Sequence, residues 1–205
     1  MAKVKLTKGE LKRQRDSLKQ YRHYLPTLLL KKQQLQMKIL EARRLYAERE
    51  KVLNAKLEEI DLWAGLLADS SVDIRSWVKP LDIFIKATNI AGANVPVYDD
   101  IRFPVAEYDL YATPFWVDRA IEETRLMATL LAELKVIREA VAVLEQELRI
   151  TTQRVNLFEK VKIPECQENI RQICIYLGDQ QANAVGVSKV AKKKIEARDM
   201  ALVIV

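Results

Sequence analysis

Histidine, cysteine and carboxylate side chains are the groups in this sequence that could perform catalysis or bind a metal ion. His23 is the only histidine among the 205 residues, so neither a zinc site nor a Ser-His-acid triad has the partners it needs. The frequent carboxylates alternate with lysine and arginine, which is typical of solvated helix flanks. They include Glu41, Glu48, Glu50, Glu58 and Glu59. We therefore expect no catalytic residue, no metal site and no cofactor.

The two cysteines and the absence of a phosphate-binding loop also argue against an enzyme. Cys166 and Cys174 lie about two helical turns apart, or roughly 12 Å, which is beyond the reach of a disulfide. Both are expected to be small core residues of a reduced, cytosolic protein. The sequence has no glycine-rich loop followed by Lys-Ser or Lys-Thr. It also has no secretory signal and no uncharged stretch near the ~20 residues that span a bilayer.

Basic residues are concentrated at the two ends of the chain, whose net charge is +6. Residues 1–22 and 186–205 are rich in lysine and arginine, whereas the remainder is slightly acidic. Scarce glycine and proline, with 30% charged residues, favour long helices over a compact sheet protein. The basic ends are either solvated helix surface or sites for an acidic partner.

Thr7 and Glu10 have the spacing of a capping box and predict the start of a long helix. An apolar seven-residue repeat then runs from Leu11 to Trp63 and indicates a coiled-coil seam. Pro26 predicts a bend rather than an end, because the repeat continues past it. The seam positions are Leu18, Leu25, Leu28, Leu35, Ile39, Leu53 and Ile60.

Thr113 and Pro114 predict the start of a second long helix, as a capping residue followed by proline at the first helical position. Its repeat begins at Met127, is broken locally by Pro164 and resumes at Cys166. The seam positions are Leu130, Leu134, Ile137, Val141, Leu144, Leu148, Val155 and Phe158.

Polar residues interrupt both seams at Lys32, Arg49, Lys56 and Thr151. Long polar side chains at such positions can extend to solvent and specify the register. Alternatively, these stretches leave room for another protein against the helices.

The middle of the chain differs from both helices in its prolines and clustered aromatic residues. Ser70 is expected to cap a short helix through Lys79, followed by an apolar run to Asn89. Val95–Tyr98 and Ile101–Phe103 are expected to form a β-hairpin whose turn is Asp99-Asp100, with Pro96 on a sheet edge. Trp63, Trp77 and Trp116 bracket this region and are expected to form its core.

The predicted fold class is all-α: a long antiparallel two-helix coiled coil formed by the N- and C-terminal helices, with a small central segment of short helix and β-hairpin. Its parts are residues 1–69, the N-terminal helix, residues 70–113, the central segment, and residues 114–205, the C-terminal helix. Folding back would bring the two basic ends together at one tip, with the hairpin at the opposite end.

A set of short motifs, in order along the chain, resembles the D subunit of the V- and A-type rotary ATPases. The second helix carries the run that is similar to the family's C-terminal signature. The hairpin segment Asn89–Gly92 with Val95-Pro96, and Trp116–Asp118 after Thr113-Pro114, resemble its central region and second helix. The signature residues are Arg154, Asn156, Glu159, Pro164 and Asn169.

The resemblance implies a non-catalytic central-stalk protein, or rotor shaft, that couples ATP hydrolysis or synthesis to proton or other ion transport. It implies a shaft tip that enters a hexamer of catalytic A and noncatalytic B subunits. It also implies contacts with a small stalk protein, the F subunit, and with a membrane-ring adaptor (the d or C subunit), at the cytoplasmic face of the membrane without insertion into it. The implied tip comprises residues 1–12 and 192–205, including Lys192, Lys193, Lys194, Leu202, Val203, Ile204 and Val205.

Two other functions are compatible with parts of the sequence. A basic coiled-coil arm could bind structured RNA, although interleaved aromatic residues are missing and the last five residues are apolar. A generic helical-hairpin scaffold is also permitted by the periodicity. An enzyme is disfavoured, because no nucleophile, base and metal ligands occur together.

Overall fold

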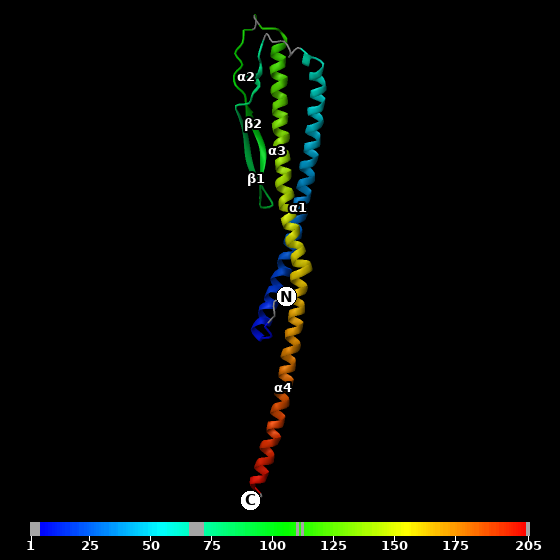
Figure 1. Ribbon diagram of the computed structural model, residues 1–205, viewed down its shortest axis with the longest axis vertical. Helices are drawn as coiled ribbons and strands as arrows, with labels where there is room; N and C mark the ends of the chain where they lie inside the picture. The colour runs from blue at the N-terminus through cyan, green and yellow to red at the C-terminus, as the bar shows by residue number, and fades with distance from the viewer. Residues whose placement is uncertain (1–4, 66–71, 110, 112, 204–205) are drawn as a thin grey trace. The chain divides into compact units, whose positions relative to one another are not determined.

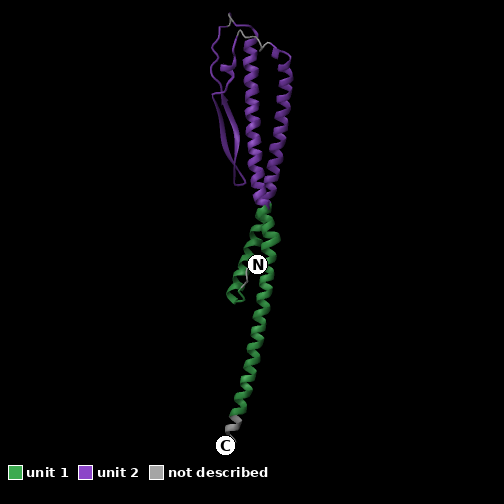
Figure 2. Cartoon of the chain, viewed as in Figure 1, with its two compact units in different colours: residues 1–29, 153–205 green, residues 30–152 purple. Residues whose placement is uncertain are grey.

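The computed structural model describes residues 5–65, 72–109, 111 and 113–203. Two long helical regions are joined in the sequence by a short helix and a two-stranded sheet, and the sheet lies beside α3, which confirms the predicted fold class (Figure 1). The chain forms two compact units: unit 1 is residues 1–29 with 153–205, and unit 2 is residues 30–152 (Figure 2). The elements are α1 (Lys8–Asp61), α2 (Arg75–Val78), β1 (Asp82–Ile90), β2 (Ala93–Arg102), α3 (Trp116–Leu157), the π-helical turn η2 (Phe158–Lys162) and α4 (Ile163–Val203).

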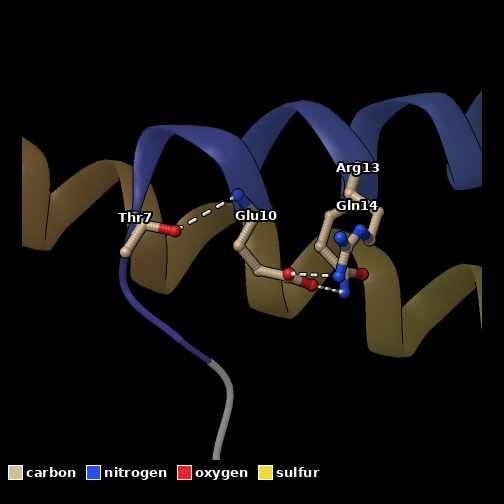
Figure 3. Close-up of polar contacts among 4 residues, drawn as sticks. All are labelled: Thr7, Glu10, Arg13 and Gln14. Carbon is tan, nitrogen blue, oxygen red and sulfur yellow. Dashed lines mark hydrogen bonds and ion pairs between the residues drawn. The ribbon is translucent and has the colours of Figure 1, made fainter.

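The first turn of α1 is capped from one side only. The Thr7 hydroxyl accepts a hydrogen bond from the Glu10 backbone N–H at 3.3 Å, as the capping pattern predicts. The Glu10 carboxylate does not reach back to Thr7. It accepts hydrogen bonds from Gln14 at 2.9 Å and from Arg13 at 3.3 Å instead, further along the helix (Figure 3). The capping box is therefore half formed, and Glu10 stabilises the helix surface.

Pro26 lies inside α1, and the helix continues to Asp61 as expected. Proline lacks the N–H that would bond to the carbonyl four residues earlier, so one backbone hydrogen bond is lost there. In the same turn, the Thr27 hydroxyl donates to the Tyr24 carbonyl oxygen at 2.8 Å.

In unit 2, α1 and α3 lie antiparallel and share two buried clusters. Leu35 and Ile39 of α1 meet Ala140 and Leu144 of α3, together with residues of the hairpin. Further along, Leu53 meets Leu130 and Leu134, with Tyr46 and Met127 packed at the margin. Because these residues recur at helical spacing on both helices, each helix covers the apolar stripe of the other.

The β-hairpin is longer than predicted, and its turn is elsewhere. β1 pairs antiparallel with β2, and the turn is Ala91-Gly92, not Asp99-Asp100. Both turn residues have positive φ, 51° and 82°, as in the two-residue turns that match strand twist. The predicted turn was wrong because Asp99 instead forms a bulge inside β2, where the register shifts between Phe84 and Ile85.

Other features of the central segment follow the sequence more closely. β2 pairs only with β1 in the described residues, so Pro96 lies on a strand with a free edge, as expected. The short helix is only Arg75–Val78, and Asp73 accepts a hydrogen bond from the Arg75 N–H at 3.0 Å. The predicted capping residue Ser70 lies outside the described residues. Trp63, Trp77 and Trp116 are all half-buried rather than fully enclosed.

In unit 1, the start of α1 lies against η2 and α4. The rings of Tyr21 and Phe158 are 5.0 Å apart. Pro164 is the second residue of α4, and the Ile163 N–H bonds to the Phe158 carbonyl, five residues back. The proline ring excludes a normal α-helical turn around residue 160, so the chain widens into a π-turn instead of ending. The predicted local break at Pro164 is therefore a π-helical turn, which adds one residue to the helix without ending it.

Candidate functional site

The candidate functional site is the seam between the helices together with the surfaces that it leaves exposed. In unit 2, Leu35 is fully buried and Leu144 is 2% exposed, so these two residues lie at the centre of the seam. The other predicted unit 2 positions are buried or half-buried. The buried ones are Ile39, Leu53, Leu130, Leu134 and Ile137, and the half-buried ones are Ile60, Val141 and Leu148.

The seam of unit 1 is shallower at its α1 side. Leu18, Leu25 and Leu28 are half-buried, as is Phe158, whereas Val155 is buried. Ile173 of α4 is fully buried, although it follows the proline break. The π-turn moves the apolar face by one residue, and this shift keeps Cys166 and Ile173 directed toward α1.

The two cysteines differ from each other. Cys166 is buried, and this burial raises the pKa of its thiol. Cys174 is exposed, with its Sγ 3.9 Å from a guanidinium nitrogen of Arg15. The expectation that both cysteines are core residues is therefore wrong for Cys174, which lies one residue after the buried Ile173, at the exposed margin of the α1–α4 contact. His23 is exposed, as expected of a single histidine on a charged helix.

Ion pairs of one polarity connect α1 and α3 in unit 2. In each pair between these helices that the described residues form, α1 supplies the cation and α3 the carboxylate. Exposed pairs of this kind contribute little individually. The observed alignment nevertheless forms all of these pairs at once, and a shifted alignment would separate these partners. The pairs are Lys31–Glu147 (3.8 Å), Arg43–Glu145 (2.5 Å), Arg49–Glu133 (3.0 Å) and Lys56–Glu123 (3.5 Å).

Two of the three polar seam residues of α1, Arg49 and Lys56, have charged partners on α3. Arg49 and Lys56, at seam positions, reach Glu133 and Glu123 on α3. The Arg49 Nε atom is close to Glu133 without hydrogen-bond alignment. A hydrogen bond to Glu59, with Glu123 nearby, raises the pKa of Lys56. These contacts favour the interpretation that polar seam residues specify the register over the interpretation that they leave room for another protein.

Most of the signature residues are on the surface. Arg154, Asn156, Glu159 and Pro164 are exposed, and Asn169 is half-buried in a small cavity of about 130 Å³ with Cys166. Packing in a core therefore does not explain why these residue types occur here. Pro164 differs, because its ring changes the local backbone of the helix. Because they are exposed, these residues are candidates for contacts with other proteins.

The last part of α4 has no cover from the rest of unit 1. Residues 178–198 are exposed throughout, including Lys192, Lys193 and Lys194. Among the described residues of unit 1, α1 does not extend along this segment and leaves it bare (Figure 1). The expectation that both basic ends lie together is therefore wrong. Arg15, within the basic start of α1, lies beside Cys174, whereas the basic run Lys192–Lys194 is further along α4 in its exposed part. α4 continues through Leu202 and Val203, and Ile204 and Val205 lie outside the described residues.

A carboxylate on α4 gives a specific pH prediction. Glu168 accepts hydrogen bonds from Arg171 at 2.9 and 2.7 Å and from Gln172 at 3.0 Å. These contacts, chiefly that of Arg171, lower the pKa of Glu168 from 4.5 to about 2. Because the folded pKa is depressed, the contacts stabilise the helix above pH 4.5, and this contribution is lost as the pH falls toward 2.

NMR titration of the Glu168 carboxyl carbon is expected to show its midpoint near pH 2. Arg171→Ala should return the midpoint toward the ordinary value. Arg154→Ala, which removes an exposed charge from the same unit, should leave it unchanged. A midpoint near 4.5 in the unmodified chain would contradict the assignment.

Among the residues that the structure describes, no three His, Cys, Asp or Glu side chains are grouped as metal ligands would be. None of the helices in those same residues is long and apolar enough to cross a membrane.

Comparison with known proteins identifies a family and related proteins. The family model for the D subunit of ATP synthase matches residues 10–193. The V-type ATP synthase D subunit of Borreliella burgdorferi is 43% identical over 195 residues, covering 95% of this chain and 96% of that protein. The protein of the same name from Chlamydia pneumoniae is 35% identical over 199 residues, covering 95% and 94%. These matches extend over nearly all of both helical regions and the central segment, and this chain belongs to the ATP synthase D-subunit family.

Proposed function

We propose that this chain is the non-catalytic central-stalk component of a V/A-type ATPase or ATP synthase. In this role it transmits torque between ATP hydrolysis or synthesis and the transport of protons or other ions. One observation carries the proposal: α1 and α3 pack together along unit 2 through two buried apolar clusters, with ion pairs such as Arg49–Glu133 and Lys56–Glu123 between them. The relatives are named as D subunits of V-type ATP synthases, and these names supply the complex in which such a rod would act.

A shaft must resist twisting along its axis. Two helices with interdigitated side chains resist it because any rotation of one against the other would open voids in a close-packed seam. Leu35, Ile39 and Leu144 supply this seam in unit 2, and Ile173 and Val155 supply it in unit 1. Slipping by one turn would also separate each ion pair of unit 2.

The bare part of α4, residues 178–198, is the segment that we propose enters the hexamer of catalytic A and noncatalytic B subunits. It combines the basic residues Lys192–Lys194 with exposed apolar residues such as Val187 and Ile195. Apolar contacts are non-directional and would resist rotation little. The basic residues would attract acidic surfaces of the surrounding proteins over a longer range.

Other surfaces are proposed for the remaining partners. Leu62, Tyr111 and Phe115 are strongly exposed where α1 ends and α3 begins, and they are candidates for contact with the adaptor (the d or C subunit) of the membrane ring. The exposed signature residues around Arg154 are candidates for contact with the small F subunit or the hexamer. In this proposal the three parts 1–69, 70–113 and 114–205 act as helix, head and helix, on the cytoplasmic side and peripheral to the membrane.

Reversible cross-linking tests the proposed rotation. In a chain with Cys166 and Cys174 replaced by alanine, Lys193→Cys is paired with a cysteine on the inner surface of one A or B subunit. Oxidation is expected to abolish ATP hydrolysis of the reconstituted complex, because a shaft tied to one member of the hexamer cannot turn. Reduction should restore hydrolysis to the level before oxidation.

The same complex without the second cysteine serves as the control, since oxidation alone should leave its activity unchanged. A cross-linked complex that hydrolyses ATP and transports ions at the original rate would refute the shaft function. Failure of the chain to assemble with A and B at all would refute its place in the complex.

A further inference from the structure

A single side chain of α3 bridges the two chain segments at the base of the hairpin. Arg125 donates hydrogen bonds from Nε and Nη2 to the Trp77 carbonyl oxygen, at 3.2 and 3.0 Å. Its Nη2 also donates to the Pro104 carbonyl oxygen, at 2.7 Å. Trp77 precedes β1 and Pro104 follows β2, so one guanidinium holds both ends of the hairpin.

Neighbouring contacts surround this arginine on the same side of α3. Its guanidinium lies 5.4 Å from the centre of the Phe103 ring. The rings of Trp77 and Tyr108 are 5.3 Å apart. A hydrogen bond with Asp118 of α3 is the main reason that the pKa of Tyr108 is raised. The segments that lead into and out of the hairpin therefore meet α3 at one place, with Arg125 in the middle.

The hairpin has a second, separate attachment near its turn. Ala93 and Val95 are buried in the cluster that contains Leu35, Ile39 and Leu144. Between the two attachments the strands are more open: Ile83, Ile85 and Val97 are exposed. A cavity of about 320 Å³ lies between β2 and the two helices, from Val95 of the turn cluster to Tyr98 in the more open stretch, with Leu45 and Glu133 among its other lining residues.

We propose that Arg125 is a positioning residue that pins the base of the hairpin to α3, independently of the buried attachment at the turn. The hairpin is then a strap held at its two ends and open in the middle. Arginine suits this role because its rigid fork of donors can reach two carbonyls at once, whereas lysine offers a single flexible ammonium. The inference depends on this geometry and not on the proposed rotary function.

Hydrogen exchange measured by mass spectrometry on the full-length chain tests the two attachments separately. In Arg125→Ala, amides at the base, such as the Leu81 N–H that bonds to the Arg102 carbonyl, should exchange at least about 10-fold faster. Amides near the turn, residues 88–96, and amides of α3 should stay within about 2-fold of the original rate. Val95→Ala should show the opposite pattern, with faster exchange near the turn.

Arg119→Ala is the matched control, because Arg119 is exposed on the same helix. It should leave exchange at the base unchanged. Arg125→Lys should lose most of the protection that Arg125→Ala loses, since charge alone cannot replace the fork. The proposal is overturned if Arg125→Ala leaves the base protected, if lysine restores full protection, or if base, turn and α3 all loosen together.

Discussion

Replacing Leu144 with alanine is expected to lower the free energy of unfolding by about 2–5 kcal/mol, the range for a leucine removed from a close-packed core. Leu144 is 2% exposed and contacts residues of α1, α3 and the hairpin in one cluster. The cavity left by the missing methyl groups would therefore be enclosed by three elements, none of which can collapse into it alone. Urea denaturation followed by circular dichroism measures the change.

Two further leucines of α3 provide internal comparisons for this experiment. Leu131→Ala removes the same atoms from a side chain that is 52% exposed, so its effect should stay near 0.5 kcal/mol. Leu148→Ala, at the half-buried margin of the same cluster, should fall between the two. Equal effects at positions 144 and 131 would contradict the placement of the seam.

Deleting residues 180–205 is expected to abolish ATP-driven ion transport by the reconstituted complex while leaving the folded core of the chain intact. Residues 180–198 are exposed throughout and contribute no side chain to the buried clusters. Their removal should therefore change the free energy of unfolding by less than about 0.5 kcal/mol. A loss of ion transport without a change in the free energy of unfolding would show that the segment is needed for a partner and not for folding.

The measurement combines a denaturation curve of the isolated chain with ion transport by the complex in vesicles. A deletion of only 201–205 provides a graded comparison and should cause a smaller loss of transport. If the chain lacking 180–205 supports transport at the original rate, the bare part of α4 has no role in coupling. If that chain unfolds instead, the segment is part of the fold rather than a free surface.

The sequence by itself determined the helices and the faces that they bury. Apolar spacing and the Thr7 cap depend only on residues a few positions apart, and such local preferences survive in the folded chain. The predicted cap at Thr113 was wrong: α3 begins at Trp116, and the Thr113 hydroxyl donates to the Asp109 carbonyl oxygen at 2.7 Å instead. The same repeat placed Leu35, Leu53 and Leu144 on the faces that the structure buries. The resemblance of short motifs also identified the family. Such a resemblance depends only on the order of residues in the sequence and not on their contacts in the fold.

The hairpin turn was not determined locally. Asp99-Asp100 has the composition of a turn, whereas Ala91 adopts a positive φ that alanine rarely takes. The turn forms at Ala91-Gly92 because this register buries Ala93 and Val95 against both helices, and Asp99 is then accommodated as a bulge. Burial of apolar residues by another element outweighed the local preference of the turn sequence.

Only the tertiary structure decided which residues meet across the helices. Lys56 pairs with Glu123, and Arg125 donates to the carbonyl oxygens of Trp77 and Pro104, so these contacts join residues far apart in the chain. The exposure of residues 178–198 likewise depends on where α1 begins alongside α4. An apolar heptad repeat predicts which residues face a partner helix. It does not predict the alignment, because a helix can slide by a heptad and keep every apolar position in the seam. The choice among those alignments depends on contacts summed over the whole interface, and no local pattern contains that sum.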